Sequence, residues 1–229
     1  MNSPIVLITG ATRGIGFAAA KQLIDRGAQV IIGSRSMKRA ESAAKKLGET
    51  AYPIRIDVTN HAVLKAAVKE IGERFGKLDV LVNNAAVLLD HYATFRELDT
   101  EVLTETLDTN LVGTFRTTIS MLPLLEKSDA LRIINVSSGA GQLDGDPQAW
   151  APAYSISKTA VNMLTQQLVA ALPEAMVNSM CPGWCRTEMG GEDATLSAEE
   201  GADTMVWLAT EAPYEMRGQF VKERKSIAW

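Results

Sequence analysis

Short runs of apolar residues alternate with longer segments of helical spacing along the whole chain. The strand-like runs cover 5–8, 29–32, 52–56, 80–82, 132–136, 176–180 and 218–221. Helical apolar spacing is found at 17–26, 37–47, 60–75, 99–124, 154–171 and 198–210. Continuous apolar strands that alternate with helices are typical of a parallel sheet covered on both faces. The sequence therefore predicts an α/β fold with a doubly wound sheet of about seven mostly parallel strands.

The pattern gives no sign of a division into separate domains. No linker, repeat or low-complexity run interrupts the 229 residues, and 46% of them are hydrophobic. We therefore expect one domain over residues 1–229. The longest irregular segments are 139–153 and 183–197, and ligands in such folds bind beyond the carboxyl ends of the strands. Segments 139–153 and 184–200 are predicted to form the substrate site.

Charge and composition argue against several classes of partner. The net charge of −4 does not favour a nucleic-acid or anionic-membrane surface. No apolar run approaches the roughly 20 residues that cross a bilayer, and residues 1–4 lack the basic region of a secretory signal. Cys181 and Cys185 form no disulfide framework, and two scattered histidines predict no zinc site. Free thiols fit a reducing cytoplasm.

The first strand runs directly into a glycine-rich turn, residues 9–16, and a helix follows. In this strand–turn–helix context the glycines allow a tight turn and a close approach of backbone to pyrophosphate. The helix N-terminus adds amide donors and the positive end of a dipole. An ordinary glycine-rich turn is the alternative. The predicted nucleotide-binding residues are Gly10, Thr12, Arg13, Gly14, Ile15 and Gly16.

Two arginines indicate which nucleotide is bound. Arg13 is a cation at a helix N-terminus, which is unfavourable unless an anion binds there. NAD-binding units place an acidic residue about 20 positions after the loop, on the ribose 2′-hydroxyl. Ser34 occupies that place, followed by Arg35, with no carboxylate nearby. Two cations without an acid fit the 2′-phosphate of NADPH or NADP⁺, which is therefore the predicted cofactor. Alternatively, Arg35 is only a solvated charge on the surface.

Tyr154 and Lys158 begin an apolar-patterned segment and are four positions apart, so they share one face of a helix. An ammonium beside a phenol favours the phenolate, and free tyrosine has a pKa of about 10. We therefore expect Lys158 to bring the pKa of Tyr154 toward the range in which general acid–base catalysis works best. The spacing alone is weak evidence, because it occurs by chance in many helices.

Together these segments resemble the short-chain dehydrogenase/reductases, and within them the carbonyl-reductase-like branch. The resemblance covers essentially the whole chain and implies a Rossmann-type fold. It rests on motifs in the order and approximate spacing of that family. These are residues 9–16, Asp57-Val58, Asn83-Asn84-Ala85-Ala86, Asn110, Ser137-Ser138, Tyr154 with Lys158, and 181–191.

The resemblance implies an NADPH-dependent reductase of an aldehyde, ketone or quinone. Tyr154 would be the general acid, and Lys158 would lower its pKa and bind the nicotinamide ribose. Ser138 would hold the substrate oxygen, and Asn110 would anchor a water that links Lys158 to solvent. Ser137 and Ser138 could instead only turn the chain, and Asn110 could be a helix-kink residue.

The resemblance also implies cofactor contacts beyond the glycine-rich turn. Asp57 would bind the adenine amino group, with Val58 beside the ring, although Asp57 could instead be a helix N-cap. Asn84 is expected to be structural. The remaining implied cofactor contacts are Ser34, Asn83, Ala85, Tyr154, Lys158, Pro182, Gly183, Cys185 and Thr187.

The sequence departs from the family pattern in three places. Ala86 replaces a glycine, and Ser138 and Tyr154 are 16 positions apart where many relatives have about 13. The extra residues fall in the segment 142–152, and a larger insertion there accompanies a monomeric state in some carbonyl reductases. This chain lacks it, so monomer and homo-oligomer both stay open. Cys185 replaces a valine and either packs or is sensitive to oxidants.

Other enzyme classes fit less well. A serine hydrolase needs G-x-S-x-G and a later histidine, and no histidine follows His91. The lysine of a P-loop NTPase is missing, and a sugar-nucleotide epimerase would need a further C-terminal region. A catalytically weak NADP(H) sensor of the same fold is the remaining alternative. A hydrophobic or aromatic carbonyl substrate is expected, because an apolar wall could be formed by Leu88, Leu143, Trp150, Trp184 and Met189.

Overall fold

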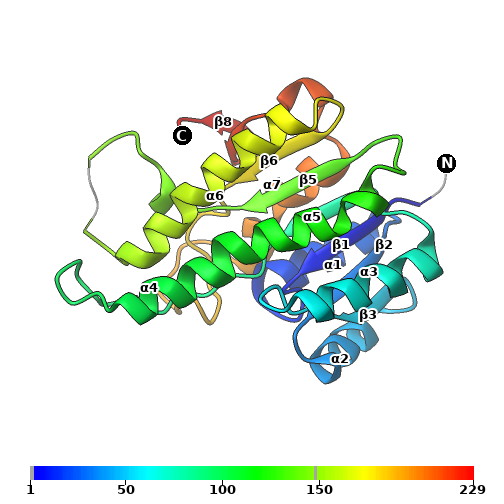
Figure 1. Ribbon diagram of the computed structural model, residues 1–229, viewed down its shortest axis with the longest axis horizontal. Helices are drawn as coiled ribbons and strands as arrows, with labels where there is room; N and C mark the ends of the chain where they lie inside the picture. The colour runs from blue at the N-terminus through cyan, green and yellow to red at the C-terminus, as the bar shows by residue number, and fades with distance from the viewer. Residues whose placement is uncertain (1–2, 147–148) are drawn as a thin grey trace.

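The computed structural model describes residues 3–146 and 149–229. Residues 1–2 lie outside the described residues; they belong to the N-terminal segment that is expected to lack a secretory signal. Residues 147–148 of the predicted substrate segment 139–153 also lie outside. One sheet of eight strands has the order β3-β2-β1-β4-β5-β6-β7-β8. All neighbours pair in parallel except β7 and β8. The predicted doubly wound α/β fold is therefore confirmed (Figure 1).

The elements follow the predicted alternation closely. The strands are β1 (Ile5–Thr9), β2 (Gln29–Ser34), β3 (Ala51–Arg55), β4 (Val80–Asn83), β5 (Arg132–Val136), β6 (Met176–Met180), β7 (Phe220–Lys222) and β8 (Lys225–Ile227). The helices are α1 (Gly14–Asp25), α2 (Met37–Leu47), α3 (His61–Phe75), α4 (Thr100–Leu107), α5 (Gly113–Leu125), α6 (Pro152–Ala171) and α7 (Ala198–Thr210). Short 3₁₀ turns cover Gly139–Gly141 and Tyr214–Met216.

Two hydrophobic cores lie on opposite faces of the sheet. Successive side chains of a strand point to opposite faces, so Val6 and Ile8 enter one core while Ile5 and Leu7 enter the other. Helices α1, α2 and α7 contribute to the first core, and α3, α5 and α6 to the second (Figure 1). Because both faces are covered, the central strands β1, β2 and β4 are mostly apolar, and the sheet is a rigid base for the loops at its edge.

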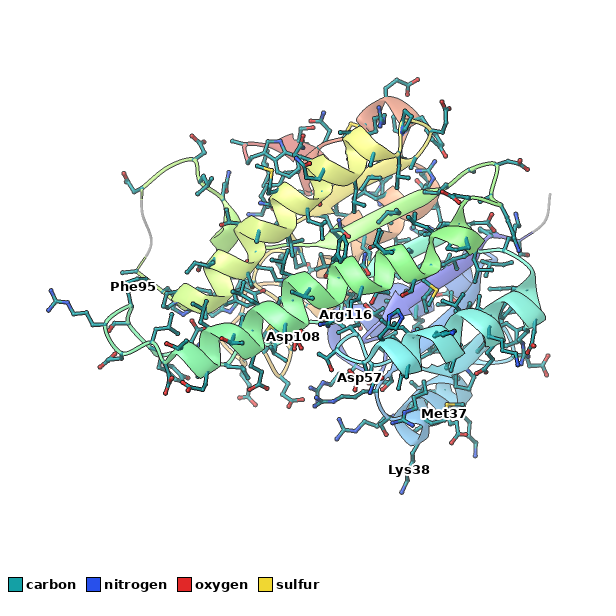
Figure 2. The ribbon with its side chains drawn as sticks, viewed as in Figure 1. Met37, Lys38, Asp57, Phe95, Asp108 and Arg116 are labelled. Carbon is teal, nitrogen blue, oxygen red and sulfur yellow. The ribbon has the colours of Figure 1, made fainter. Side chains whose placement is uncertain are left out.

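The single helix expected at 99–124 is in fact three consecutive segments. A π-helical segment, Asp108–Val112, separates α4 from α5. Arg116 of α5 forms a 2.8 Å ion pair with Asp108 of this segment, and Figure 2 shows Asp57 below them. Apolar spacing does not distinguish a five-residue π turn from the α-helices on either side, so the sequence pattern did not reveal it. Such widened turns often occur at functional sites.

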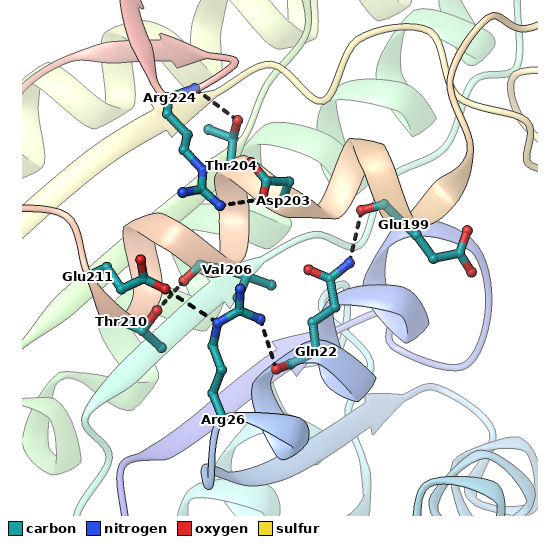
Figure 3. A network of polar contacts seen from close by, with 9 residues as sticks. All are labelled: Gln22, Arg26, Glu199, Asp203, Thr204, Val206, Thr210, Glu211 and Arg224. Carbon is teal, nitrogen blue, oxygen red and sulfur yellow. Dashed lines mark hydrogen bonds and ion pairs between the residues drawn. The ribbon is translucent and has the colours of Figure 1, made fainter.

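Polar contacts link α1 to α7 on one face of the sheet (Figure 3). Gln22 donates from Nε2 to the carbonyl of Glu199 at 2.9 Å, and Arg26 lies 3.3 Å from a Glu211 carboxylate oxygen. Arg224, from the turn between β7 and β8, donates from Nε to Asp203 of α7 at 2.7 Å. The β7–β8 turn is thereby fixed to α7, which follows the predicted substrate loop.

Candidate functional site

The predicted site residues gather at the carboxyl ends of the strands. Figure 1 shows the loop between β5 and α6 and the loop leading into α4 at the same end of the molecule. This edge is where ligands bind in open α/β sheets.

The glycine-rich turn has the geometry of a phosphate-binding cradle. Gly10 and Gly14 have φ values of 66° and 55°, which favour glycine. A Cβ on Gly16 would lie 2.6 Å from Nδ2 of Asn84 and 2.8 Å from the carbonyl of Gly10. Asn84 donates from Nδ2 to the carbonyl of Thr9 at 2.8 Å, so the predicted structural role of Asn84 is supported. The glycines are therefore required by the left-handed turn and by its close packing against Asn84.

Arg13 lies in the N-cap position of α1 without capping it. Its guanidinium forms a 2.5 Å ion pair with Glu188, and the side chains are 63% and 71% exposed. Glu188 belongs to the loop after β6, which places this loop against the glycine-rich turn. Thr187 lies there too, since a Cβ on Gly14 would be 3.2 Å from its Cγ2. The structure thus brings Thr187 beside the turn, as expected for a cofactor contact.

Strand β2 is followed by Arg35, with no carboxylate residue beside it in the sequence. Ser34 is buried, and its hydroxyl accepts from the N–H of Ser36 at 3.2 Å. Arg35 is exposed and makes no hydrogen bond or ion pair with any described residue. An exposed guanidinium is available for a phosphate, which it can bind through two parallel hydrogen bonds. The donor set at this corner therefore fits a 2′-phosphate.

Asp57 and Val58 follow β3 (Figure 2). Asp57 accepts hydrogen bonds through Oδ1 from the N–H and the hydroxyl of Thr59, at 3.1 and 2.7 Å. The N-cap of α3 is Asn60, so the alternative role of Asp57 as that helix cap is not observed. Val58 is buried against Gly113, where a Cβ would lie 2.7 Å from Cγ2 of Val58. Asp57 is half-buried and retains a carboxylate oxygen for a ligand.

Tyr154 and Lys158 lie on the buried face of α6. Lys158 donates from Nζ to the carbonyl of Val136 at 2.7 Å, and this nitrogen is 5.5 Å from the centre of the Tyr154 ring. Burial raises the pKa of Tyr154 to about 12 and lowers the pKa of Lys158 to about 8. The expected lowering of the Tyr154 pKa by Lys158 is therefore wrong for this structure, because loss of solvation outweighs the hydrogen bond with Ser138, which acts in the opposite direction.

The two serines after β5 have different partners. Ser137 is buried and donates from its hydroxyl to the carbonyl of Lys158 at 3.2 Å. Ser138 accepts from the N–H of Ala140 at 3.2 Å, and a side-chain hydrogen bond between Ser138 and Tyr154 acts against the raised pKa of the phenol. Ser138 therefore both turns the chain and contacts Tyr154, whereas Ser137 is committed to the backbone of α6.

Asn110 lies inside the π-helical segment and is buried. Its Oδ1 accepts from the N–H of Val87 at 2.8 Å, and its Nδ2 donates to the carbonyl of Val87 at 2.9 Å. Nδ2 also donates to the hydroxyl of Ser157 at 3.0 Å. The alternative role of Asn110, at an irregularity in the helix, is therefore observed. The irregularity directs the Asn110 amide toward α6.

Asn83 is placed differently from the expected lining of a cofactor trough. It is buried, and its Nδ2 donates to the hydroxyl of Thr118 and to Oδ1 of Asn135, both at 2.9 Å. Its side chain thus lies in the interior between β4, β5 and α5. Ala85, by contrast, remains at the edge, where its N–H donates to the hydroxyl of Thr9 at 3.0 Å.

Cys185 is packed in the interior, which is the first of the two roles expected for it, packing or sensitivity to oxidants. Its thiol donates to the carbonyl of Pro182 at 3.2 Å and lies against Gly201 of α7. Burial raises the pKa of Cys185 to about 11, which disfavours the reactive thiolate. Gly183 has a φ of 78° and sits against Leu196, so the chain turns sharply there. The remaining predicted loop residues, Thr12 and Ile15, are half-buried.

Trp150 packs beside Tyr154, and most of the other predicted wall residues are exposed. The Trp150 ring is edge-on to the Tyr154 ring at 6.1 Å, and His91 is edge-on to Trp150 at 5.5 Å. Trp184 donates from Nε1 to the carbonyl of Gly190 at 2.8 Å and is partly exposed. Of the other predicted wall residues, Leu143 and Met189 are exposed and Leu88 is half-buried.

The sequence reasoning missed three residues that the structure places at this site. Glu188 pairs with Arg13, and Ser157 donates from its hydroxyl to the carbonyl of Tyr154 at 2.6 Å. Asp90 is buried and accepts from the N–H of Ala153 at 2.6 Å. Asp90 follows five apolar residues, 85–89, and this isolated charge was the available signal.

The described residues contain neither a membrane-spanning helix nor a cluster of metal ligands. None of the helices there is both long and apolar enough to span a membrane. No group of three or more His, Cys, Asp or Glu side chains among them could hold a metal ion.

Comparisons with known proteins agree with this architecture. Residues 4–197 match the family described as short chain dehydrogenase. A short-chain dehydrogenase of Penicillium roqueforti, anuI, is 38% identical, with 99% of this chain and 97% of that protein covered. Carbonyl reductase (NADPH) 1 of Sus scrofa is 30% identical, with 100% and 95% covered.

A solved structure extends the likeness to three dimensions. Carbonyl reductase Sniffer of D. melanogaster superposes with a TM-score of 0.92 at 29% identity, with 100% of each chain covered. Both the sequence match and the superposition span the glycine-rich turn, the tyrosine–lysine helix and the loop after β6. The chain therefore belongs to the short-chain dehydrogenase family of oxidoreductases, and it resembles the carbonyl reductases within it.

Proposed function

We propose that the protein is an NADPH-dependent carbonyl reductase in which Tyr154 is the general acid. The observation that carries this proposal is the contact of Tyr154 with Ser138 beside buried Lys158. A phenol whose pKa is raised to about 12 is protonated at neutral pH. It can therefore give a proton to a carbonyl oxygen during reduction.

The cofactor assignment rests on residues at the other end of the site. The cradle of Gly10, Gly14 and Gly16 suits a pyrophosphate, and Arg13 and Arg35 suit a 2′-phosphate. The pig relative carries NADPH in its name. Asp57 and Val58 would bind the adenine, and Thr187 would contact the nicotinamide amide or the pyrophosphate.

The chemistry divides between the cofactor and the chain. When bound, NADPH supplies the hydride that the carbonyl carbon accepts. Ser138 hydrogen-bonds the substrate oxygen, and the Tyr154 hydroxyl passes its proton to that oxygen as the alcohol forms. The ammonium of Lys158 stabilises the resulting tyrosinate until solvent returns the proton, along a route to which Asn110 would hold a water.

The chain is proposed to act as one domain on a hydrophobic or aromatic carbonyl compound. The segments 139–153 and 184–200 would border the substrate, and their exposed Leu143, Trp150 and Trp184 support an apolar ligand. Two buried free thiols are compatible with a reducing cytoplasm.

NADPH oxidation against a panel of quinones, aromatic aldehydes and aliphatic ketones tests the proposal. Turnover with some members, lost in Tyr154→Phe, is expected. Tight NADPH binding without turnover of any member would contradict it and favour an NADP(H) sensor of the same fold.

A further inference from the structure

The segment after β4 contains a buried carboxylate that the proposed chemistry does not use. Asp90 is 3% exposed, and its Oδ2 accepts from the N–H of Ala153 at 2.6 Å. Its Oδ1 is also buried and has no hydrogen-bond partner among the described residues. Burial of a carboxylate is unfavourable unless hydrogen bonds compensate for lost solvation. The hydrogen bond from the N–H of Ala153 therefore compensates the Asp90 side chain for its lost solvation.

That contact replaces a cap that α6 cannot provide for itself. The N-cap residue, Ala151, has no side-chain acceptor, and its φ of 43° is in the left-handed region that a non-glycine residue rarely adopts. Pro152 follows and has no N–H. Ala153 thus has the first N–H of the helix that can be capped, and Asp90 supplies both the acceptor and a negative charge at the positive end of the dipole.

The same segment is joined to α6 at a second point. Val87 is bound through its N–H and its carbonyl by the Asn110 amide, which also donates to the hydroxyl of Ser157 at 3.0 Å. Ser157 in turn donates to the carbonyl of Tyr154 at 2.6 Å. The N–H just before Tyr154 and the carbonyl of Tyr154 itself are therefore both held from this side. Segment 87–90 therefore contacts the start of α6 directly through Asp90, and it is linked to the carbonyl of Tyr154 only through Asn110 and Ser157.

We propose that Asp90 is a positioning residue for the reduction, which holds the first turn of α6, and with it the phenol of Tyr154, in the reactive geometry. The inference rests on the proposed function. Misplacement of a reacting group by about 1 Å can cost about 100-fold in rate. Loss of the Ala153 contact would free the strained turn at Ala151 to relax and shift the phenol relative to Ser138.

Three variants test this role. Asp90→Ala removes the acceptor, and we expect kcat to fall about 10- to 100-fold with the KM for NADPH unchanged. Asp90→Asn keeps an oxygen acceptor, and asparagine caps helices as well as aspartate, so it should restore most of the activity. Asp99→Ala is the matched control, because Asp99 caps α4 by accepting from the N–H of Glu101 at 3.1 Å. It should retain the wild-type kcat.

Two results would overturn the inference: a wild-type kcat in folded Asp90→Ala, or an Asp90→Asn variant as impaired as Asp90→Ala. If Asp90→Ala does not fold, hydrogen exchange of the Ala153 amide in the wild-type protein decides. Slow exchange supports the cap, and exchange as fast as an uncapped first-turn amide contradicts it. A wild-type protein without any turnover would refute the proposed function itself, whereas active wild type with unaffected Asp90→Ala would refute only this inference.

Discussion

Arg13 of the glycine-rich turn and Glu188 of the loop after β6 form an ion pair of 2.5 Å. Arg13 is one of the two cations that we propose for the 2′-phosphate, so Glu188 and the cofactor would compete for the same guanidinium. The side chains are mostly exposed, and exposed pairs contribute only about 0.2–1 kcal/mol. The competition is therefore weak enough for a phosphate to win.

We predict that Glu188→Gln binds NADPH more tightly, by up to about fivefold, because the pair to be broken is worth at most about 1 kcal/mol. Fluorescence titration of NADPH at low and high salt measures the effect, which should shrink as salt screens the pair. Glu192→Gln, in the same loop and exposed, is the control. Equal gains in both variants would show that only the general charge of the loop matters.

Arg35→Ala should raise the KM for NADPH about 10- to 100-fold and leave the KM for NADH unchanged, since a hydrogen bond to a charged group is worth roughly 1.5–3 kcal/mol. Steady-state kinetics with both cofactors give the comparison. Lys46→Ala removes an exposed cation from the last turn of α2 and serves as the control. A wild-type enzyme that binds NADH as tightly as NADPH would contradict the 2′-phosphate assignment.

Tyr154→Phe should bind NADPH normally and lose about 10²- to 10⁴-fold in kcat, the usual contribution of a positioned general acid. The variant removes one hydroxyl from a buried ring, so the fold should persist. Circular dichroism and cofactor titration establish that the protein is intact, and NADPH oxidation measures the loss. Undiminished turnover would end the general-acid assignment.

The pH dependence of reduction should follow Lys158. Burial lowers the pKa of Lys158 to about 8, so its ammonium is present below that pH and is lost above it. Tyr154, with a pKa raised to about 12, stays protonated over the same range. We therefore expect kcat for reduction to be level near neutrality and to fall above about pH 8, because the cation that balances the tyrosinate disappears. In Lys158→Met the rate should be low and this fall absent; a fall retained there would assign it to another group.

Most of the fold could be predicted from the sequence because both cores follow local periodicity. The strands at 132–136 and 176–180 and the helices at 37–47 and 198–210 have the predicted bounds. The eighth strand, β8, was missed because its three residues, Lys225–Ile227, are polar or half-exposed and pair only through the tight turn after β7. The π-helical segment was missed because it is only five residues long, and apolar spacing does not distinguish so short a π turn from the α-helices on either side.

The site was predictable where chemistry is local and not where it depends on tertiary contacts. Tyr154 and Lys158 are one helical turn apart, so their spacing alone placed them together. The pKa of Tyr154 could not be inferred from that spacing, because burial by other elements decides it. Asp90 contacts Ala153, which is 63 positions later in the sequence. Glu188 likewise pairs with Arg13 from a distant segment, and no sequence pattern links the members of either pair.

The turn between β7 and β8 points to a way of making the protein more heat-resistant. Glu223 and Arg224 both adopt left-handed conformations, with φ values of 51° and 59°. Hairpins of this kind prefer Asn-Gly, and a non-glycine residue in this region costs roughly 1–2 kcal/mol. Arg224 is held by Asp203, so Glu223 is the position to change. Glu223→Asn would relieve backbone strain at a residue to which we assign no role in the chemistry, which makes this corner a starting point for engineering a sturdier catalyst.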